Sequence, residues 1–350
     1  MGGMNARRGS RDLLNAGCGI LFLFGLAFGT GWRTQTSAAR KGAYPLRVAY
    51  FPNLTHAPAL VGVAKGFFQK DLPDYDVSTR VVNAGPEAME ALLAGEVDVA
   101  YVGPSPATNT FLKTNGQSLT IVAGACSGGA SLVARADLPI SSVRDLDGHS
   151  VAVPQLGGTQ DVSCRHFLLQ SGLESKEHGG TVSIIPAKNP DILTLFRRKQ
   201  IDAAWVPEPW ASRLRSETGA KTVVDERSLW PNRRFTTTVV VVRRAFADAH
   251  PDAVQAFVSS HERTVSWIQG HPAEAQSTVN GELKRLTGKL LGNLVLKEAW
   301  GKLDFTTDPN LTSIQALASA AYQAGYLKAA PGTLPGLVDT RALLALKGGK

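Results

Sequence analysis

A carboxylate and two indoles lie close together in the stretch "DAAWVPEPW", residues 202–210. Glu208 stands between two prolines, and Trp205 and Trp210 flank it on either side. A carboxylate among aromatic rings could act as a general acid or base, or could hold the amine of a ligand. It could also simply begin a helix, where acidic side chains are favoured. The sequence offers Glu208 no partner for acid–base chemistry.

Sequence motifs that signal catalysis are missing from the chain. It has no G-x-S-x-G, no Walker loop and no dinucleotide fingerprint, and its seven histidines lack metal-ligand spacing. We therefore expect a protein that is not an enzyme and that carries no metal and no cofactor. The formal net charge is +8, and an N-terminal leader accounts for +3 of it, with four arginines and one aspartate. The remaining charge of about 8 − 3 = +5 is only mildly basic, so we expect no nucleic-acid partner.

The N-terminus has the pattern of an export signal. Arginines precede an uncharged run over residues 13–32, whose strongly apolar part covers only 20–28, and small residues follow at 36–38. We expect residues 1–38 to be a signal peptide, with an uncleaved membrane anchor as the alternative. The protein would then be periplasmic or otherwise extracytoplasmic. In that oxidising compartment Cys126 and Cys164 could pair or remain two buried thiols.

Beyond residue 45, short apolar runs alternate with helical patterns, which predicts parallel sheets covered by helices. Strands are expected at 46–51, 77–82, 97–102, 119–125, 150–154, 182–187, 202–206 and 221–226. Helices are expected at 57–68, 86–95, 104–115, 159–172 and 190–199.

The pattern contains an internal repeat. Residues 86–102, "PEAMEALLAGEVDVAYV", match residues 190–206, "PDILTLFRRKQIDAAWV", at a constant offset of 104. Asp98 pairs with Asp202 in this register, and Tyr101 pairs with Trp205. The repeat predicts two similar α/β lobes.

A strand-like run at 235–246 and a helical C-terminal region follow the second lobe. We expect these helices to pack back on the first lobe, so that the chain crosses between lobes near 128–133 and near 235–242. Lobe one would then comprise 45–130 plus 241–345, and lobe two 131–240. Two crossings form a hinge, which predicts a cleft that closes on a ligand.

Ligands of open α/β sheets bind beyond the carboxyl ends of the strands, which selects the loops 52–57, 83–87, 103–107, 154–161, 187–191 and 207–210. Most of these loops run straight into a helix, and helix starts bind anions without lysine or arginine. The candidate ligand-binding residues are Asn53, His56, Pro86, Ser105, Gln155, Gly158, Thr159, Gln160, Asp161, Asn189, Trp205, Glu208 and Trp210. Tyr101, Trp205 and Trp210 could wall the cleft. The polar members could equally be helix caps, turn residues or solvated side chains.

Four stretches carry a family resemblance: "FPNLTHAPALVGVAKGFF", "LLAGEVDVAYVGPSP", "SVRDLDGHSVAVPQLGGTQDV" and "IDAAWVPEPWASRL". They resemble the periplasmic substrate-binding components of sulfonate, nitrate and taurine ABC importers, which share a fold with thiamine-pyrimidine-synthase-like proteins. The resemblance covers about residues 46–335. It implies an α/β, two-lobed type II periplasmic-binding fold, with two doubly wound sheets joined by a two-stranded hinge. It also implies delivery of the ligand to an ABC permease in the inner membrane.

The expected ligand is a small organic anion or zwitterion, an alkyl or amino sulfonate, bound by a monomer. Glu208 would repel a bare anion, which favours a sulfonate that bears an amine over nitrate. A thiamine pyrimidine precursor or nitrate is the alternative ligand. Synthase chemistry is disfavoured, because the region that corresponds to a cysteine-rich motif reads "GACSGGAS" with one cysteine. A sensory periplasmic protein, or an enzyme that uses Glu208, are the other classes that we consider.

Overall fold

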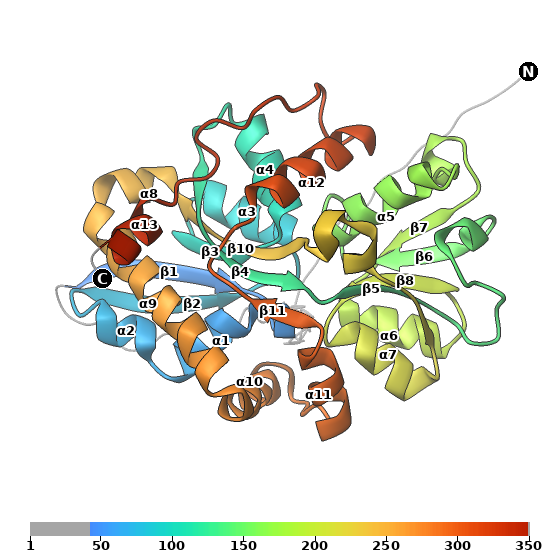
Figure 1. Cartoon of the computed structure of the whole chain (residues 1–350), viewed down its shortest axis with the longest axis horizontal. Coiled ribbons are helices and arrows are strands. Elements are labelled where there is room, and N and C mark those ends of the chain that lie inside the picture. Colours follow the sequence, from blue (N-terminus) through green and yellow to red (C-terminus); the bar gives the residue numbers. More distant parts are fainter. Residues whose placement is uncertain (1–42, 349–350) are drawn as a thin grey trace, which may run out of the picture. The chain divides into compact units, whose positions relative to one another are not determined.

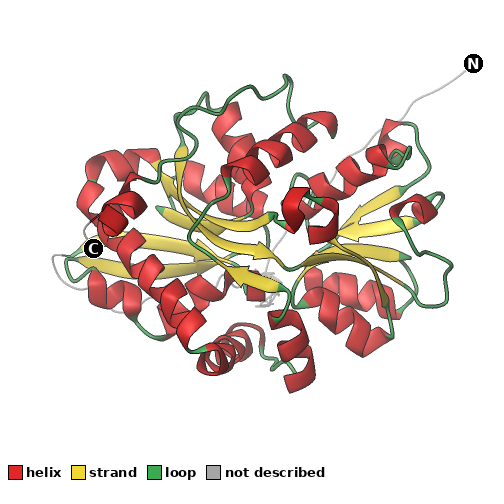
Figure 2. Cartoon of the chain, viewed as in Figure 1, coloured by secondary structure: helices red, strands yellow, loops and turns green. Residues whose placement is uncertain are grey.

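A computed structural model describes residues 43–348 of the chain. The expected signal peptide lies outside these residues. The described chain forms two mixed sheets with helices on both faces of each (Figures 1 and 2). None of the helices in this part of the chain has the length and apolar character that a bilayer span requires.

The first sheet has six strands in the order β11-β4-β10-β3-β1-β2. Its strands are β1 (Tyr44–Tyr50), β2 (Tyr75–Val81), β3 (Val99–Val102), β4 (Leu119–Gly128), β10 (Thr236–Arg243) and β11 (Leu303–Phe305). The second sheet has five strands in the order β7-β6-β8-β5-β9. Its strands are β5 (Ala130–Ala134), β6 (Ser150–Val153), β7 (Ser183–Pro186), β8 (Ala203–Pro207) and β9 (Lys221–Asp225).

The two sheets repeat one topology. The series β2-β1-β3-β10-β4 in the first sheet corresponds to β7-β6-β8-β5-β9 in the second. In each series the fourth strand is antiparallel to both neighbours and comes from the other half of the chain, since β10 follows β9 and β5 follows β4. The internal repeat in the sequence therefore corresponds to a repeat in space. Sequence analysis missed β5 and β11, which are short, and expected the β5 segment to be part of a crossing.

The helices of the repeated part are α1 (Ala57–Ala64), α2 (Phe67–Asp71), α3 (Gly85–Leu93), α4 (Pro104–Lys113), α5 (Thr159–Gln170), α6 (Asn189–Arg197) and α7 (Trp210–Thr218). The helix expected over 57–68 is interrupted at Gly66, which has a positive φ of 67°. The C-terminal helices are α8 (Arg244–Ala249), α9 (Pro251–Gly270), α10 (Pro272–Thr287), α11 (Asn293–Trp300), α12 (Leu311–Gln323) and α13 (Arg341–Gly348).

Each sheet separates two hydrophobic cores, because strand side chains alternate between its faces. In β1, Leu46, Val48 and Tyr50 pack with α9 and α10, whereas Ala49 packs with α3 and α4 on the other face. Cys126 and Cys164 are buried in the cores of different sheets and are not bonded to each other. Of the two alternatives for these cysteines, the structure therefore has two buried thiols, and burial raises the pKa of both.

The chain crosses between the sheets at two points that lie side by side. The first crossing is Gly128–Gly129, between β4 and β5, where both glycines have positive φ values of 75° and 73°. The second crossing, between β9 and β10, passes through two short 3-10 turns, Glu226–Leu229 and Pro231–Arg233. The Gly128 amide donates to the Phe235 carbonyl at 3.0 Å, which ties the two crossings together.

Helix α12 departs from the expectation that every C-terminal helix packs on the first lobe. It contacts α4 of the first half and α5 of the second, and Figure 1 shows it between them. Ile314 and Ala318 belong to a core of the first sheet, whereas Leu317 and Ala321 belong to a core of the second. One helix thus packs in a core of each sheet. Composition alone does not reveal such a double contact.

Asp98 and Asp202 are equivalent in the repeat. Each joins two strands of its own sheet, at equivalent places in the two sheets. Asp98 is fully buried and accepts hydrogen bonds from the Arg47 side chain at 2.8 Å and from Arg243 at 2.7 Å. Asp202 accepts from the Ser150 amide at 2.9 Å and pairs with Arg135. Each carboxylate joins the strand that precedes it in the repeat to the antiparallel strand contributed by the other half.

We predict that Asp98→Asn lowers the free energy of unfolding by about 3 kcal/mol, because it leaves two arginines beside a neutral amide. The matched substitution Asp202→Asn should cost less, because 24% of the Asp202 side chain is exposed against 1% for Asp98. Urea denaturation of both variants measures the difference. Equal losses of unfolding free energy in the two variants would contradict the expected effect of burial.

Candidate ligand-binding site

A pocket lies where the carboxyl ends of the strands of both sheets meet, and all six loops that sequence analysis selected contribute to it. The space between its walls is about 460 Å³, open solvent included. The first half supplies Phe51, Asn53, Thr55, His56, Asn83, Ala84, Gly85, Gly103 and Pro106. The second half supplies Pro154, Gln155, Gly158, Thr159, Gln160, Asn189 and Pro207, and β10 adds Thr237.

Seven of the predicted site residues line this pocket: Asn53, His56, Gln155, Gly158, Thr159, Gln160 and Asn189. The structure therefore brings together residues that lie more than 100 positions apart in the chain. Most of the lining residues that the prediction missed belong to the same loops. Thr237 lies within a buried strand, and nothing in its sequence neighbourhood points to the pocket.

The start of α5 is the strongest anion-binding feature of the pocket. Its N-cap is Gly158, which has no side chain to cap the helix, and the first helical hydrogen bond runs from the Val162 amide to the Gly158 carbonyl at 3.0 Å. The amides of residues 159–161 precede that bond and have no helical acceptor. The starts of α3, α4 and α6 contain prolines, which lack the amide hydrogen. Helix α5 thus offers the fullest set of free donors.

Two side chains of the second half bring unpaired polar atoms to the pocket wall. Thr159 is 3% exposed and Asn189 is 7% exposed. Thr159 Oγ1 and Asn189 Oδ1 have no hydrogen-bond partner among the described residues. Buried polar atoms are usually paired, so two unpaired ones that line the same pocket indicate a place for a ligand.

The two halves touch within the pocket where Gly103, the N-cap of α4, approaches Thr159. A Cβ atom at residue 103 would lie 2.2 Å from Thr159 Oγ1 and 3.2 Å from Thr159 Cβ. A side chain at residue 103 would therefore push the start of α5 away from the first sheet. Gly103 lies in one of the selected loops, but its closeness to Thr159 cannot be read from the sequence.

His56 is an uncharged donor in the pocket wall. It is 2% exposed, and its ring stacks on Phe51 with ring centroids 4.2 Å apart. Burial lowers the pKa of His56 to about 3, so the imidazole is neutral at physiological pH. The Phe51 amide donates to Nδ1 at 3.3 Å, which places the ring proton on Nε2.

Asp161 does not line the pocket, although sequence analysis selected it. Its side chain is fully buried and accepts hydrogen bonds from the Gly157 amide at 2.7 Å, from Arg165 at 2.9 Å and from the Tyr326 hydroxyl. These contacts hold the loop that leads into α5. The pairing with Arg165 also offsets a negative charge that would otherwise oppose an anion at this helix start.

The aromatic side chains that we expected to wall the cleft do not line the pocket. Tyr101 is fully buried in a core of the first sheet, and Trp205 is fully buried in a core of the second. The Tyr101 hydroxyl bonds His261 Nδ1 at 2.9 Å, and the Trp205 indole donates to Glu226 Oε2 at 2.7 Å. They occupy equivalent positions of the repeat in strands buried on both faces, so their size serves packing and not ligand contact.

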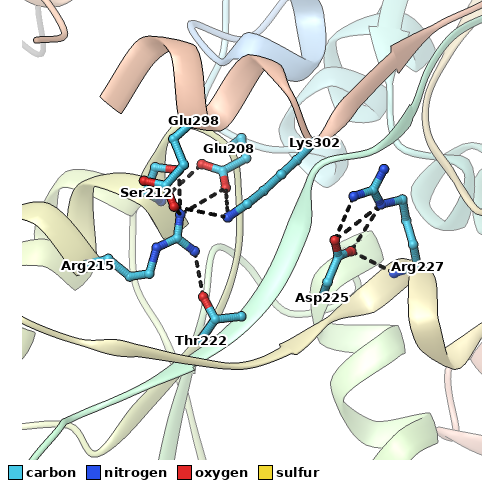
Figure 3. A network of polar contacts seen from close by, with 8 residues as sticks. All are labelled: Glu208, Ser212, Arg215, Thr222, Asp225, Arg227, Glu298 and Lys302. Carbon is cyan, nitrogen blue, oxygen red and sulfur yellow. Dashed lines mark hydrogen bonds and ion pairs between the residues drawn. The ribbon is translucent and has the colours of Figure 1, made fainter. Parts of the chain in front are cut away.

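Glu208 does not line the pocket either. Figure 3 shows its carboxylate beside Ser212 and Lys302. Its fully buried carboxylate accepts from the Ser212 amide at 3.0 Å and from Lys302 Nζ at 3.1 Å. Lys302 directly precedes β11 of the first sheet, so this ion pair joins the two halves outside the pocket lining. Arg215 of α7 adds a second link to Glu298 of α11 at 2.5 Å. The carboxylate that could have repelled an anion is therefore neutralised within the protein.

The remaining predicted residues lie near the pocket without lining it. Ser105 is fully buried in the first turn of α4, next to the lining residue Pro106. Pro86 is half-buried in the first turn of α3, beside the lining residue Gly85. Trp210 is 6% exposed at the start of α7, and its indole donates to Asn53 Oδ1 at 2.9 Å. In all three cases another residue of the selected loop lines the pocket.

Similarity to solved structures identifies the class of fold. The alkanesulfonate-binding protein SsuA from Xanthomonas axonopodis pv. citri, solved bound to MOPS, superposes with a TM-score of 0.71 at 19% identity, over 84% of this chain and 98% of that one. The periplasmic nitrate-binding protein NrtA from Synechocystis PCC 6803 superposes with a TM-score of 0.76 at 15% identity, over 88% and 89%. The chain therefore has the two-lobed periplasmic-binding-protein fold.

Residues 40–281 match the model of the NMT1-like family, and the chain belongs to that family. Among curated relatives, the taurine-binding periplasmic protein of Escherichia coli (strain K12) is 30% identical over 206 residues. That alignment covers 58% of this chain and 60% of the relative.

We predict that Gly103→Ala weakens ligand binding about 10-fold or more, because the new methyl group holds the start of α5 away from the first sheet. Thermal stability should change little, since the clash lies between the halves and not inside a core. Isothermal titration calorimetry measures the affinity, and circular dichroism measures the unfolding temperature.

Gly281→Ala in α10 is the matched control, because a Cβ there meets nothing within 4 Å. It should leave the affinity unchanged. An affinity of Gly103→Ala equal to that of the unmodified protein would show that the approach of Gly103 to Thr159 is not needed for binding.

Proposed function

We propose that this chain is the extracytoplasmic solute-binding component of an ABC importer, and that it captures a small alkanesulfonate between its two lobes. The observation that carries the proposal is the start of α5, where free amides and the unpaired Thr159 hydroxyl meet in a pocket built from both sheets. A helix start of this kind stabilises a negative charge, and a sulfonate offers three oxygens to such donors.

The apolar part of the pocket favours an organic anion over nitrate. Phe51, Ala84 and three prolines contribute to the wall. An alkyl group could pack against these side chains, whereas nitrate has no apolar part to bury. The names of the related proteins agree with this choice, since a taurine-binding and an alkanesulfonate-binding protein are among them. The nitrate-binding structural neighbour keeps nitrate as an alternative to be tested.

Ligand capture would couple to lobe closure. We propose the division into a first lobe, 45–130 plus 241–345, and a second lobe, 131–240, with α12 in contact with both. Rotation about Gly128–Gly129 would separate Gly103 from Thr159 and open the pocket. The closed form would be the one that an inner-membrane permease recognises. We propose that the protein acts as a periplasmic monomer without catalysis, exported by the signal peptide expected at residues 1–38.

A titration panel of ethanesulfonate, butanesulfonate, nitrate and the aminopyrimidine precursor of thiamine tests the proposal. A sulfonate should bind with 1:1 stoichiometry and raise the unfolding temperature, because a ligand that binds only the folded state stabilises it. Calorimetry gives the stoichiometry, and a thermal-shift assay gives the ranking. Binding of the pyrimidine or of nitrate without binding of either sulfonate would overturn the choice of ligand.

We further predict that Thr159→Ala weakens sulfonate binding about 10-fold, because it removes a hydroxyl donor to a charged group. Thr159→Ser keeps the hydroxyl and should stay within about 3-fold of the unmodified protein. Comparing the two variants separates the contribution of the Thr159 hydroxyl to the affinity from that of its methyl group. Equal losses for alanine and serine would mean that Thr159 contributes packing and not a hydrogen bond.

A further inference from the structure

Asn53 in the pocket wall is held by a hydrogen bond from the other half of the molecule. Trp210 Nε1 donates to Asn53 Oδ1 at 2.9 Å, and both side chains are more than nine-tenths buried. Asn53 follows β1 of the first sheet, whereas Trp210 begins α7 beside the second sheet. The bond therefore exists only while the two halves are together.

The chemistry of this bond fixes the orientation of the Asn53 amide. An indole nitrogen only donates, so the amide atom that faces Trp210 must be the oxygen. The amide nitrogen, Nδ2, then remains as the group with which Asn53 can contact a ligand in the pocket. Asn189 across the pocket has no partner for Oδ1 among the described residues, so its amide can offer either atom.

His56 also has its acceptor atom engaged by a donor of the protein. Its Nδ1 accepts from the Phe51 amide, and Nε2 carries the proton. Both polar side chains thus have their acceptor atoms engaged inside the protein and their donors left over. A ligand that lies against this wall must present acceptors.

We propose that Trp210 is a positioning residue that sets the ligand preference of the pocket. By holding the Asn53 oxygen, it turns the amide donor of Asn53 toward the ligand and makes the first-sheet wall a pair of neutral donors with His56. An ammonium group that lies against this wall would meet donors, so the wall favours an alkanesulfonate without an amine over an aminoalkanesulfonate. The inference rests on the proposed function. It replaces the expectation of an amine-bearing ligand, which relied on a free Glu208.

Ethanesulfonate and taurine form a matched pair of probes, since they differ only by one amine. Calorimetry on the full chain should show that ethanesulfonate binds about 10-fold or more tightly than taurine, because the ammonium group loses water and meets donors. If neither probe nor any other sulfonate binds, the proposed function fails. If taurine binds more tightly than ethanesulfonate, the inference fails while the proposed function stands.

Trp210→Phe removes the indole donor and keeps an aromatic ring in its place. The Asn53 amide is then free to turn, so the affinity for ethanesulfonate should fall about 3- to 10-fold while that for taurine falls less. The measured quantity is the ratio of the two dissociation constants, which a loss of packing alone would not change. An unchanged ratio, whether both affinities fall together or neither moves, would overturn the role of Trp210.

Asn53→Asp provides an isosteric second variant that does not alter the core. One carboxylate oxygen would accept from Trp210, and the other would present a negative charge to the pocket. Ethanesulfonate affinity should fall about 100-fold or more, and taurine should become the preferred ligand. Retention of the original preference would contradict the placement of the Asn53 amide nitrogen toward the ligand.

Trp267→Phe in α9 is the control for the tryptophan substitution. Trp267 packs against Phe67 and His271, within the first half and away from the pocket wall. Both dissociation constants should stay within about 2-fold of the unmodified values, as for substitutions remote from a site. A change in the ratio in this variant would show that the readout responds to general loosening, and the inference would then fall.

Discussion

The close approach of Gly103 to Thr159 is the contact on which the pocket depends. Neither sheet holds a site alone, because the free amides of α5 come from one half while His56 and Asn53 come from the other. A methyl group at residue 103 would lie 2.2 Å from the Thr159 hydroxyl oxygen, so a side chain there would force Thr159 to shift. The two crossings between the halves lie side by side, because the Gly128 amide donates to the Phe235 carbonyl.

The charges of the protein are arranged so that the pocket itself stays neutral. Glu208 pairs with Lys302 and Asp161 pairs with Arg165, and both carboxylates are buried outside the pocket wall. His56 is kept neutral by burial. What remains toward a ligand is the partial positive charge of a helix start together with uncharged amide, hydroxyl and imidazole groups, among them the unpaired Asn189 Oδ1. Such a set can hold a singly charged anion at low desolvation cost, because no full charge of the protein must be stripped of water.

The fold was largely predictable from the sequence, because strand and helix periodicities and the repeat at an offset of 104 are local patterns. The rule for open sheets selects the six loops that contribute to the pocket. Which residue of a loop faces the pocket was not predictable. Tryptophan and glutamate stand out in the sequence, yet Trp205 and Glu208 are buried by tertiary contacts with Glu226 and Lys302. Gly103 and Thr237 look ordinary in the sequence and lie on the wall.

A crystal structure of the protein with bound ethanesulfonate tests the central claim most directly. The account predicts that the sulfonate oxygens accept hydrogen bonds from the amides at the start of α5, from the Thr159 hydroxyl and from Asn53 Nδ2, with the ethyl group toward the prolines of the wall. It also predicts that Asn53 Nδ2 faces the ligand while Trp210 still donates to Oδ1. A sulfonate bound elsewhere, or one held by a lysine or arginine side chain away from α5, would contradict the account.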